Sequence, residues 1–265
     1  MSNIYEAKAS SALETLALTT ALDYLDTVSQ QAAAENWSYS HFLGYLLEAE
    51  LIARHKRMVT ACLRFARFPY MKKLSDFDYD AQPGLDKRLI EELSTGRFLY
   101  DGRSVVFLGP PGVGKTHLAI GLGVMTAELG GKVYFTTVID MARRLTKAMQ
   151  ENKLHREMKA LIAPKLLIID EVGYLNLDST QASLLFQVIC KRYDADKSII
   201  LTSNKTFSDW GQVFAGDSVM AAAALDRLLH RCTVVNIRGE SYRLREKNKS
   251  SKSLRTLDFQ ISSQQ

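Results

Sequence analysis

The sequence predicts an α/β protein in which a parallel sheet is covered by helices on both faces, preceded by a small all-helical N-terminal domain. Residues 1–68 place their apolar side chains at helical spacing, whereas short apolar runs alternate with helical patterns after residue 72. A glycine-rich loop joins the first of these apolar runs to a helix. Strand–helix alternation at this spacing is typical of a doubly covered parallel sheet.

The N-terminal part is expected to be helical throughout. Apolar residues over 13–28 recur every three or four positions and predict one buried stripe. After a polar break at 35–40, a second helical run covers about 41–68 and is expected to end before Pro69. The turn-rich stretch SDFDYDAQPG then marks a linker. We therefore predict a helical domain at 1–70, an α/β domain at 71–246 and a flexible polar tail at 247–265.

The α/β domain is expected to contain five strands with helices between them. The strands are predicted near 104–108, 132–135, 165–169, 198–202 and 233–237. The helices are predicted near 115–129, 138–150, 153–162, 179–193 and 219–230. Because parallel strands present their carboxyl ends at one edge of the sheet, the residues that follow these strands are expected to share a ligand site.

The loop GPPGVGKT at 109–116 follows the first strand and opens a helix, and it matches G-x-x-x-x-G-K-[ST]. Its glycines let backbone N–H groups point at phosphate oxygens. Lys115 is expected to reach the β- and γ-phosphates and to act in catalysis, and the Thr116 hydroxyl is expected to bind magnesium. The motif predicts a site for ATP with Mg²⁺, with contacts from Gly109, Pro110, Pro111, Gly112, Val113, Gly114, Lys115, Thr116 and His117.

Two further strands end in polar residues suited to hydrolysis. KLLIIDE at 165–171 delivers two carboxylates, which are costly at the end of a buried strand unless they meet a cation or water. Asp170 fits an acid that holds magnesium through water, and Glu171 fits the base that polarises the attacking water. SIILTSN ends in Asn204, which is expected to hydrogen-bond the γ-phosphate or orient the water.

The order of these motifs resembles the AAA+ ATPases, which implies an AAA+ P-loop sheet sandwiched by helices. ALDRLLHR at 224–231 resembles the arginine-bearing helix of the initiator and helicase-loader branch, and RGESYRLRE at 238–246 resembles the segment that follows it in DnaC-like loaders and in IstB proteins. The helical N-terminal part, with Glu50 and Arg54, and the element from Phe68 to Tyr79 are similar to IstB, the helper ATPases of insertion-sequence transposition.

This resemblance implies a head-to-tail homo-oligomer, a ring or spiral, in which one subunit's arginine completes its neighbour's ATP site. Arg231 matches the position of that arginine finger, and Arg227 is expected on the same helix face four residues earlier. Arg243 is a candidate second sensor of the nucleotide. For Phe77 and Tyr79 two interpretations stay open, contact with adenine and aromatic packing in the core.

A basic stretch precedes the α/β domain. Residues 51–75 contain no acid, and four arginines are expected within an arc of about 140° on one helix face at about 100° per residue. Such a stripe suits contact with the phosphates of a nucleic-acid backbone, without base readout, and the resemblance to IstB proteins implies that this partner is double-stranded DNA. The predicted DNA contacts are Arg54, Arg57, Arg64, Arg67, Lys72 and Lys73.

Composition excludes several other classes. The formal charge of +5 permits a polyanionic partner without demanding one, and the three cysteines and five histidines show no zinc-site or disulfide pattern. The N-terminus lacks a secretory signal and the longest apolar stretch is about half a membrane span, so a cytoplasmic bacterial protein without a membrane partner is expected.

Three functions are compared. The first is a helper of a transposase that oligomerises on duplex DNA and regulates target choice through ATP binding and hydrolysis, with the helical domain holding DNA or the transposase. The second is a DnaC-like helicase loader that prefers single strands. The third is a P-loop kinase for a small molecule, whose activity would survive Arg231→Ala.

Overall fold

A computed structural model describes residues 2–242 of the chain. The chain divides into two compact units, 1–61 and 62–265, and the boundary lies inside a helix. The division at residues 70 and 246 that the sequence predicts stays a prediction. Within the described residues no helix is both long enough and apolar enough to cross a membrane.

The first unit is built from helices α1 (Ser2–Thr15), α2 (Thr19–Ala34) and most of α3 (Tyr39–Ala66). The single stripe expected over 13–28 is interrupted, because Ala17 has a left-handed φ of 52° and separates α1 from α2. Its core is small and consists of Ala21, Leu25, Val28 and Leu46. Helix α3 ends three residues before Pro69, as the sequence predicts.

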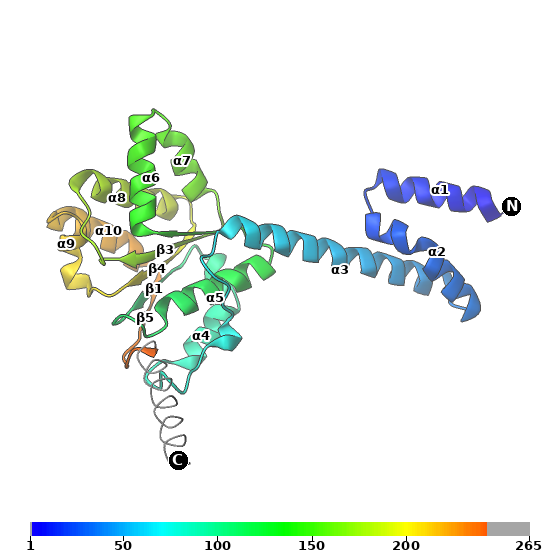
Figure 1. Ribbon diagram of the computed structural model, residues 1–265, viewed down its shortest axis with the longest axis horizontal. Coiled ribbons are helices and arrows are strands. Elements are labelled where there is room, and N and C mark those ends of the chain that lie inside the picture. Colours follow the sequence, from blue (N-terminus) through cyan, green and yellow to red (C-terminus); the bar gives the residue numbers. More distant parts are fainter. Residues whose placement is uncertain (1, 243–265) are drawn as a thin grey trace, which may run out of the picture. The chain divides into compact units, whose positions relative to one another are not determined.

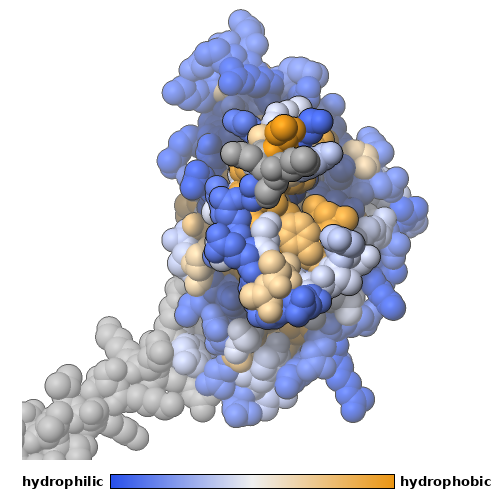
Figure 2. Space-filling model, turned by 90° about the vertical axis from the view of Figure 1, so that its right-hand side faces the viewer, coloured by the Kyte–Doolittle hydropathy of each residue, from blue (hydrophilic) through white to orange (hydrophobic). Residues whose placement is uncertain are grey.

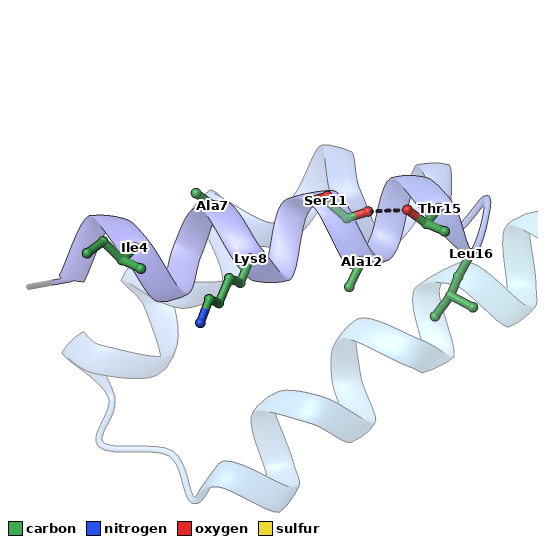
Figure 3. Close-up of a pocket in the computed structure, with 7 residues that line it drawn as sticks. All are labelled: Ile4, Ala7, Lys8, Ser11, Ala12, Thr15 and Leu16. Atoms are coloured by element: carbon green, nitrogen blue, oxygen red, sulfur yellow. Dashed lines mark hydrogen bonds between the residues drawn. The ribbon is translucent and has the colours of Figure 1, made fainter.

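Much apolar surface in the first unit remains exposed, including Ile4, Tyr39 and Leu51. A hollow of about 870 Å³ runs along α1 between Ile4 and Leu16 (Figure 3). Figure 2, turned from the view of Figure 1, shows apolar side chains gathered in the middle of one face within a hydrophilic surround.

Glu50 is the main polar feature of this unit. Its side chain is only 2% exposed, and its Oε2 accepts hydrogen bonds from Thr20 N at 2.7 Å and Ala21 N at 3.1 Å. These are orphan donors at the start of α2, whose own N-cap residue Leu18 offers no side-chain acceptor. Burial alone would raise the pKa of Glu50, but hydrogen bonds from Ala21 N, Arg57 and Thr20 N hold it below its ordinary value. Glu50 therefore caps α2 from the neighbouring helix.

The second unit contains one five-stranded, all-parallel sheet in the order β2-β3-β4-β1-β5 (Figure 1). All five strands were predicted within a few residues, and the α/β fold class is confirmed. Most residues of β1, β2 and β3 and every residue of β4 are buried, as expected for a sheet covered on both faces, whereas the edge strand β5 is largely not buried. Their bounds are β1 (Ser104–Leu108), β2 (Val133–Thr137), β3 (Leu166–Val172), β4 (Ser198–Ser203) and β5 (Cys232–Asn236).

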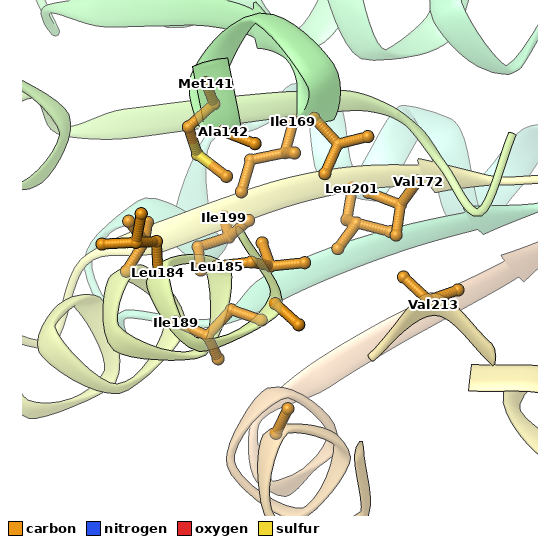
Figure 4. Close-up of a cluster of buried hydrophobic side chains, with 14 of the residues drawn as sticks. Met141, Ala142, Ile169, Val172, Leu184, Leu185, Ile189, Ile199, Leu201 and Val213 are labelled. Atoms are coloured by element: carbon orange, nitrogen blue, oxygen red, sulfur yellow. The ribbon is translucent and has the colours of Figure 1, made fainter. Parts of the chain in front are cut away.

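Helices cover both faces of this sheet. On one face α4 and α5 pack with side chains such as Phe107 and Ile168. On the other face the remaining helices enclose a second apolar cluster that includes Ile169 and Leu201 (Figure 4). The helices are α4 (Lys87–Ser94), α5 (Lys115–Glu128), α6 (Val138–Gln150), α7 (Leu154–Ile162), α8 (Ser179–Asp194), α9 (Trp210–Val213) and α10 (Ser218–His230), with short 3₁₀ helices η1 (Leu74–Asp76), η2 (Arg97–Leu99) and η3 (Phe207–Asp209).

Two features of this unit were not predicted. Helix α4 begins where Asp86 accepts hydrogen bonds from Arg88 N and Leu89 N, directly after the predicted linker. Arg192 of α8 is fully buried, and its guanidinium donates to five backbone carbonyls at 2.6–3.3 Å. Burial lowers the pKa of Arg192 to about 9, which leaves it charged at neutral pH. Arg192 thereby ties the end of α7 to β3 and β4.

Candidate functional site

The loop at 109–116 connects β1 to α5 at the carboxyl edge of the sheet. At two of its glycines, close neighbours leave no room for a Cβ atom. A Cβ at Gly112, where φ is 83°, would lie 2.1 Å from Ser241 Oγ, and a Cβ at Gly114, where φ is 99°, would lie 2.5 Å from Phe77 Cε2. The backbone also accepts a hydrogen bond from Tyr242 N at Gly112 O. The loop is thus held in its turned shape from two sides.

Lys115 and Thr116 begin helix α5, so the N–H groups of its first turn face the loop. Lys115 Nζ lies 2.7 Å from both Gly109 O and Pro110 O, which places the ammonium across the mouth of the loop. Thr116 Oγ1 lies 3.0 Å and 3.1 Å from the two carboxylate oxygens of Asp170. Helix start, ammonium and hydroxyl together form a cradle suited to a polyphosphate.

Asp170 sits near the end of β3, where its side chain is 4% exposed. Besides the Thr116 hydroxyl, its Oδ1 accepts a hydrogen bond from Thr202 Oγ1 at 2.5 Å. Thr202 comes from β4, the neighbouring strand, and its hydroxyl oxygen also accepts from Glu171 N at 3.0 Å. The two strands that the sequence marks as ending in polar residues are therefore joined through Thr202, whose part in the site was not predicted.

Glu171 adopts a left-handed backbone with a φ of 62°, and the β3–β4 register is irregular between Ile169 and Val172. A non-glycine residue in this region costs roughly 1–2 kcal/mol. The irregularity turns the Glu171 side chain out of the sheet and leaves it exposed beside the buried Asp170. Such a strained carboxylate at a ligand edge suits a group that must face substrate rather than the core.

Asn204 follows the last residue of β4 and is exposed. Ser203 accepts a hydrogen bond at its carbonyl from Gly109 N, so Asn204 lies directly beside the start of the loop. The sheet thus brings the loop, Asp170, Glu171 and Asn204 to one edge, where the sequence predicts them.

The residues at this edge fit magnesium. The Thr116 hydroxyl and the Asp170 carboxylate are hard oxygen donors of the kind that Mg²⁺ prefers. Among the described residues no group of three or more His, Cys, Asp or Glu side chains could hold a metal alone. Mg²⁺ commonly binds one or two protein carboxylates and completes its coordination shell with water and phosphate oxygens.

A cavity of about 310 Å³ opens beside the loop. Phe77 lines it, is 8% exposed and makes edge-on contacts with Tyr79 and His117. His117 Nε2 lies 2.9 Å from Lys73 O, so the ring packs beside the loop, and its contact with ATP stays a prediction. Phe77 packs against neighbouring rings and lines this cavity, and its contact with adenine stays a prediction. Tyr79 is not among the residues that line this cavity.

Lys72 and Gln82 also line this cavity, although the sequence predicts a DNA contact for Lys72 and no role for Gln82. Lys73 lies 3.9 Å from Glu128 in a long ion pair. A second hollow, of about 460 Å³, opens on the other side of Asp170 and Glu171.

The arginines expected from a neighbouring subunit need one correction. Arg231 is the C-cap of α10 with a φ of −133°, so it does not share a helix face with Arg227. The chain leaves the helix there because Arg231 O accepts a hydrogen bond from Ser104 N of β1, directly before β5 begins at Cys232. The Arg231 side chain is half exposed and lies 3.0 Å from Asp196, whereas Arg227 stacks on Phe186. Arg243 lies outside the described residues.

The basic stripe also needs a correction. Arg67 lies beyond the end of α3 with a φ of 58°, so it leaves the helix face predicted for it and stacks on Tyr134. Arg54 and Arg57 do lie on α3, but each forms an ion pair with Glu50, which is just outside the acid-free window. Both remain about half exposed, and Arg64 is exposed.

A family model and several relatives match most of this chain. Residues 11–250 match the family described as IstB-like ATP binding protein. The chain is 48% identical over 220 residues, 83% of its length, to a protein of insertion sequence IS5376 from Geobacillus stearothermophilus, of which 87% is covered. It is 46% identical over 227 residues, 86% of its length, to a protein of IS21 from Pseudomonas aeruginosa, of which 85% is covered. Both relatives are described as ATP-binding.

Solved structures support the fold. AMPPCP-bound DnaA from Aquifex aeolicus aligns with a TM-score of 0.53 at 20% identity, over 69% of this chain and 55% of DnaA. The DnaC helicase loader aligns with a TM-score of 0.50 at 24% identity, over 57% of this chain and 86% of the loader.

Proposed function

Because this chain belongs to the IstB-like ATP-binding proteins, we propose that it is an ATPase that assembles on double-stranded DNA as the helper of a transposase. The observation that carries the enzymatic part is the contact between Thr116 of the loop and the buried Asp170 of β3. It joins the phosphate cradle to the carboxylates at the same edge of the sheet.

The triphosphate is bound by the backbone N–H groups of the loop and the start of α5. Lys115 exchanges its contacts with Gly109 O and Pro110 O for the β- and γ-phosphates. Thr116, and Asp170 through water, would hold Mg²⁺, which would supply positive charge to neutralise the phosphates. Thr202 fixes the Asp170 carboxylate from the neighbouring strand, so that this group is already in place when the nucleotide arrives.

Glu171 polarises the attacking water. Its backbone N–H is anchored to Thr202 Oγ1, and its left-handed conformation turns the carboxylate outward from the sheet edge. Asn204, beside the start of the loop, orients the water or the γ-phosphate. The two carboxylates therefore have different roles. Asp170 is buried, accepts hydrogen bonds from two hydroxyls and faces the metal, whereas Glu171 is exposed and faces the attacking water.

Assembly supplies the last catalytic group. Arg231 is half exposed at the end of α10, and it reaches the γ-phosphate of a neighbouring subunit in a ring or spiral. Neutralising the charge of the transferred phosphoryl in this way contributes about 10³–10⁵ in rate in other ATPases and GTPases. Arg227, packed on Phe186, supports the helix rather than the phosphate.

The similarity to insertion-sequence proteins supports contact with a transposase, and the exposed arginines of α3 support contact with DNA. The relatives are ATP-binding proteins of insertion sequences, and the resemblance to IstB implies action together with a transposase. The exposed halves of Arg54 and Arg57, and Arg64 further along α3, are available to DNA phosphates. Lys72 lines the cavity beside the loop and Lys73 forms a long ion pair with Glu128, and contact of both lysines with DNA stays a prediction.

Glu171→Gln tests this proposal directly. The variant keeps the fold and the nucleotide site, so it should bind ATP, accumulate on duplex DNA and hydrolyse ATP at least about 100-fold more slowly. Electron microscopy of this variant with ATP and duplex DNA should show rings or filaments clasping the DNA. Single particles beside bare DNA would contradict the proposed assembly, and undiminished hydrolysis would contradict the role of Glu171.

Two measurements distinguish the alternative functions from this proposal. A helicase loader would prefer single strands to duplex in the same binding assay. A small-molecule kinase would transfer phosphate without assembly, so its turnover would not change with protein concentration or with Arg231→Ala.

A further inference from the structure

Helices α7 and α8 form an apolar groove with no part in the proposed nucleotide site. Its volume is about 610 Å³. Met158 is buried at its floor, and Leu154 and Ile162 are partly exposed while packing against the core below. These three side chains are spaced four residues apart on α7, so they form one ridge along the helix.

The shape of this groove suits another helix. Side chains four residues apart form ridges that interlock with the ridges of a neighbouring helix. Helix α7 has nine residues and is thus about 13 Å long, which matches two to three turns of an occupant. An occupant with apolar residues at positions i, i+4 and i+7 would cover Leu154 and Ile162.

The rim of the groove is positively charged. Lys159 and Lys191 are exposed, and each lies in the last turn of its helix. Across residues 2–242, neither lysine has a carboxylate within ion-pair distance, whereas Lys147 and Lys153 nearby both pair with Glu151. His155 and Gln187 add polar groups without negative charge. The groove therefore presents two uncompensated cations beside an apolar floor.

We propose that this groove binds an acidic amphipathic helix of a partner protein. The apolar residues of such a helix would lie on Leu154, Met158 and Ile162, and its carboxylates would meet Lys159 and Lys191. Duplex DNA fits the cations but not the floor, because phosphates leave apolar side chains uncovered. The proposal goes beyond the ATPase function, since no part of it requires ATP, DNA or a transposase.

The test uses the full chain and three fluorescent synthetic peptides of about twelve residues. The first places leucines along one helix face with glutamates elsewhere, the second has lysines in place of those glutamates, and the third has the acidic composition in scrambled order. Fluorescence anisotropy should show the acidic amphipathic peptide binding at least about tenfold more tightly than either of the others.

Charge reversal locates the site. In the double variant Lys159→Glu/Lys191→Glu, affinity for the acidic peptide should fall at least about tenfold and affinity for the basic peptide should rise. A matched control, Lys8→Glu/Lys56→Glu, makes the same charge change on exposed residues of the N-terminal unit and should leave binding intact. ATP binding should be retained in both variants, which verifies folding and separates this test from the proposed ATPase function.

Several results would overturn the proposal. Equal binding of the scrambled peptide would show that composition alone is recognised. Unchanged peptide binding in Lys159→Glu/Lys191→Glu would place the site elsewhere. If this variant instead lost duplex DNA affinity, or self-association measured by sedimentation, the groove would be a nucleic-acid contact or a contact between copies of the chain.

Discussion

Asp170→Asn separates magnesium-dependent binding from folding more cleanly than a truncation would. The Asp170 carboxylate accepts hydrogen bonds from two hydroxyls, Thr116 Oγ1 and Thr202 Oγ1. A hydroxyl can donate or accept, so both can still pair with an amide of the same shape. Exchanging a charged acceptor for a neutral one costs about 1 kcal/mol per bond, hence about 2 kcal/mol of unfolding free energy. The fold should survive this loss.

The ligand response should change far more. Wild-type chain held at about 100 times the dissociation constant of Mg-ATP gains about 2.7 kcal/mol of stability from binding. In Asp170→Asn the part of this stabilisation that depends on Mg²⁺ should disappear. The variant should keep only the stabilisation that ATP gives when EDTA removes the metal. Hydrolysis should fall by at least about 100-fold.

The assay is thermal unfolding with ATP in the presence of Mg²⁺ or EDTA, combined with phosphate release. Glu171→Gln serves as the matched control, because it also removes one carboxylate charge at this edge but should keep the Mg²⁺-dependent stabilisation. If Asp170→Asn retained the full Mg²⁺-dependent shift, the assignment of Asp170 to the metal would be wrong.

Three further outcomes are expected. Arg231→Ala should bind ATP normally and hydrolyse it about 10³-fold more slowly. Mixing it with Lys115→Ala subunits should restore phosphate release, since the Lys115→Ala subunit supplies Arg231 and the Arg231→Ala subunit supplies an intact ATP site. Arg192→Leu should lose about 3–5 kcal/mol of unfolding free energy in a denaturant titration, because five carbonyls lose a charged donor, whereas the exposed Arg156→Leu should be near neutral. Because the folded-state pKa of Glu50 is lowered, its contribution to stability is present above about pH 4.5 and is lost as pH falls below that value; circular dichroism of Glu50→Gln should show a shallower acid dependence than wild type.

Most of the site was predictable because its signals are local. The glycines, Lys115 and Thr116 are contiguous, and an apolar strand ending in Asp170 and Glu171 needs no knowledge of its neighbours. Thr202 was missed because its contact with Asp170 depends on β4 lying beside β3, and strand order cannot be read from one sequence. The turn of Glu171 out of the sheet likewise follows from a register irregularity between two strands.

The errors have physical causes of the same kind. The helical periodicity that placed Arg67 on α3 and Arg231 on α10 continues in the sequence past the residues where each helix ends. The acid-free window begins at residue 51 and so leaves out Glu50, which forms ion pairs with both Arg54 and Arg57. The burial of Arg192 was not predicted, because the five backbone carbonyls that accept its hydrogen bonds leave no pattern in the sequence.

The most direct test of the central claim is ATP binding and phosphate release by Lys115→Ala, with Lys132→Ala as a control that also removes one lysine. If the loop at 109–116 wraps a triphosphate, loss of the ammonium that spans its mouth should abolish measurable hydrolysis and weaken ATP affinity, and Lys132→Ala should behave as wild type. Unchanged affinity and unchanged phosphate release in Lys115→Ala would contradict the assignment of this loop to ATP.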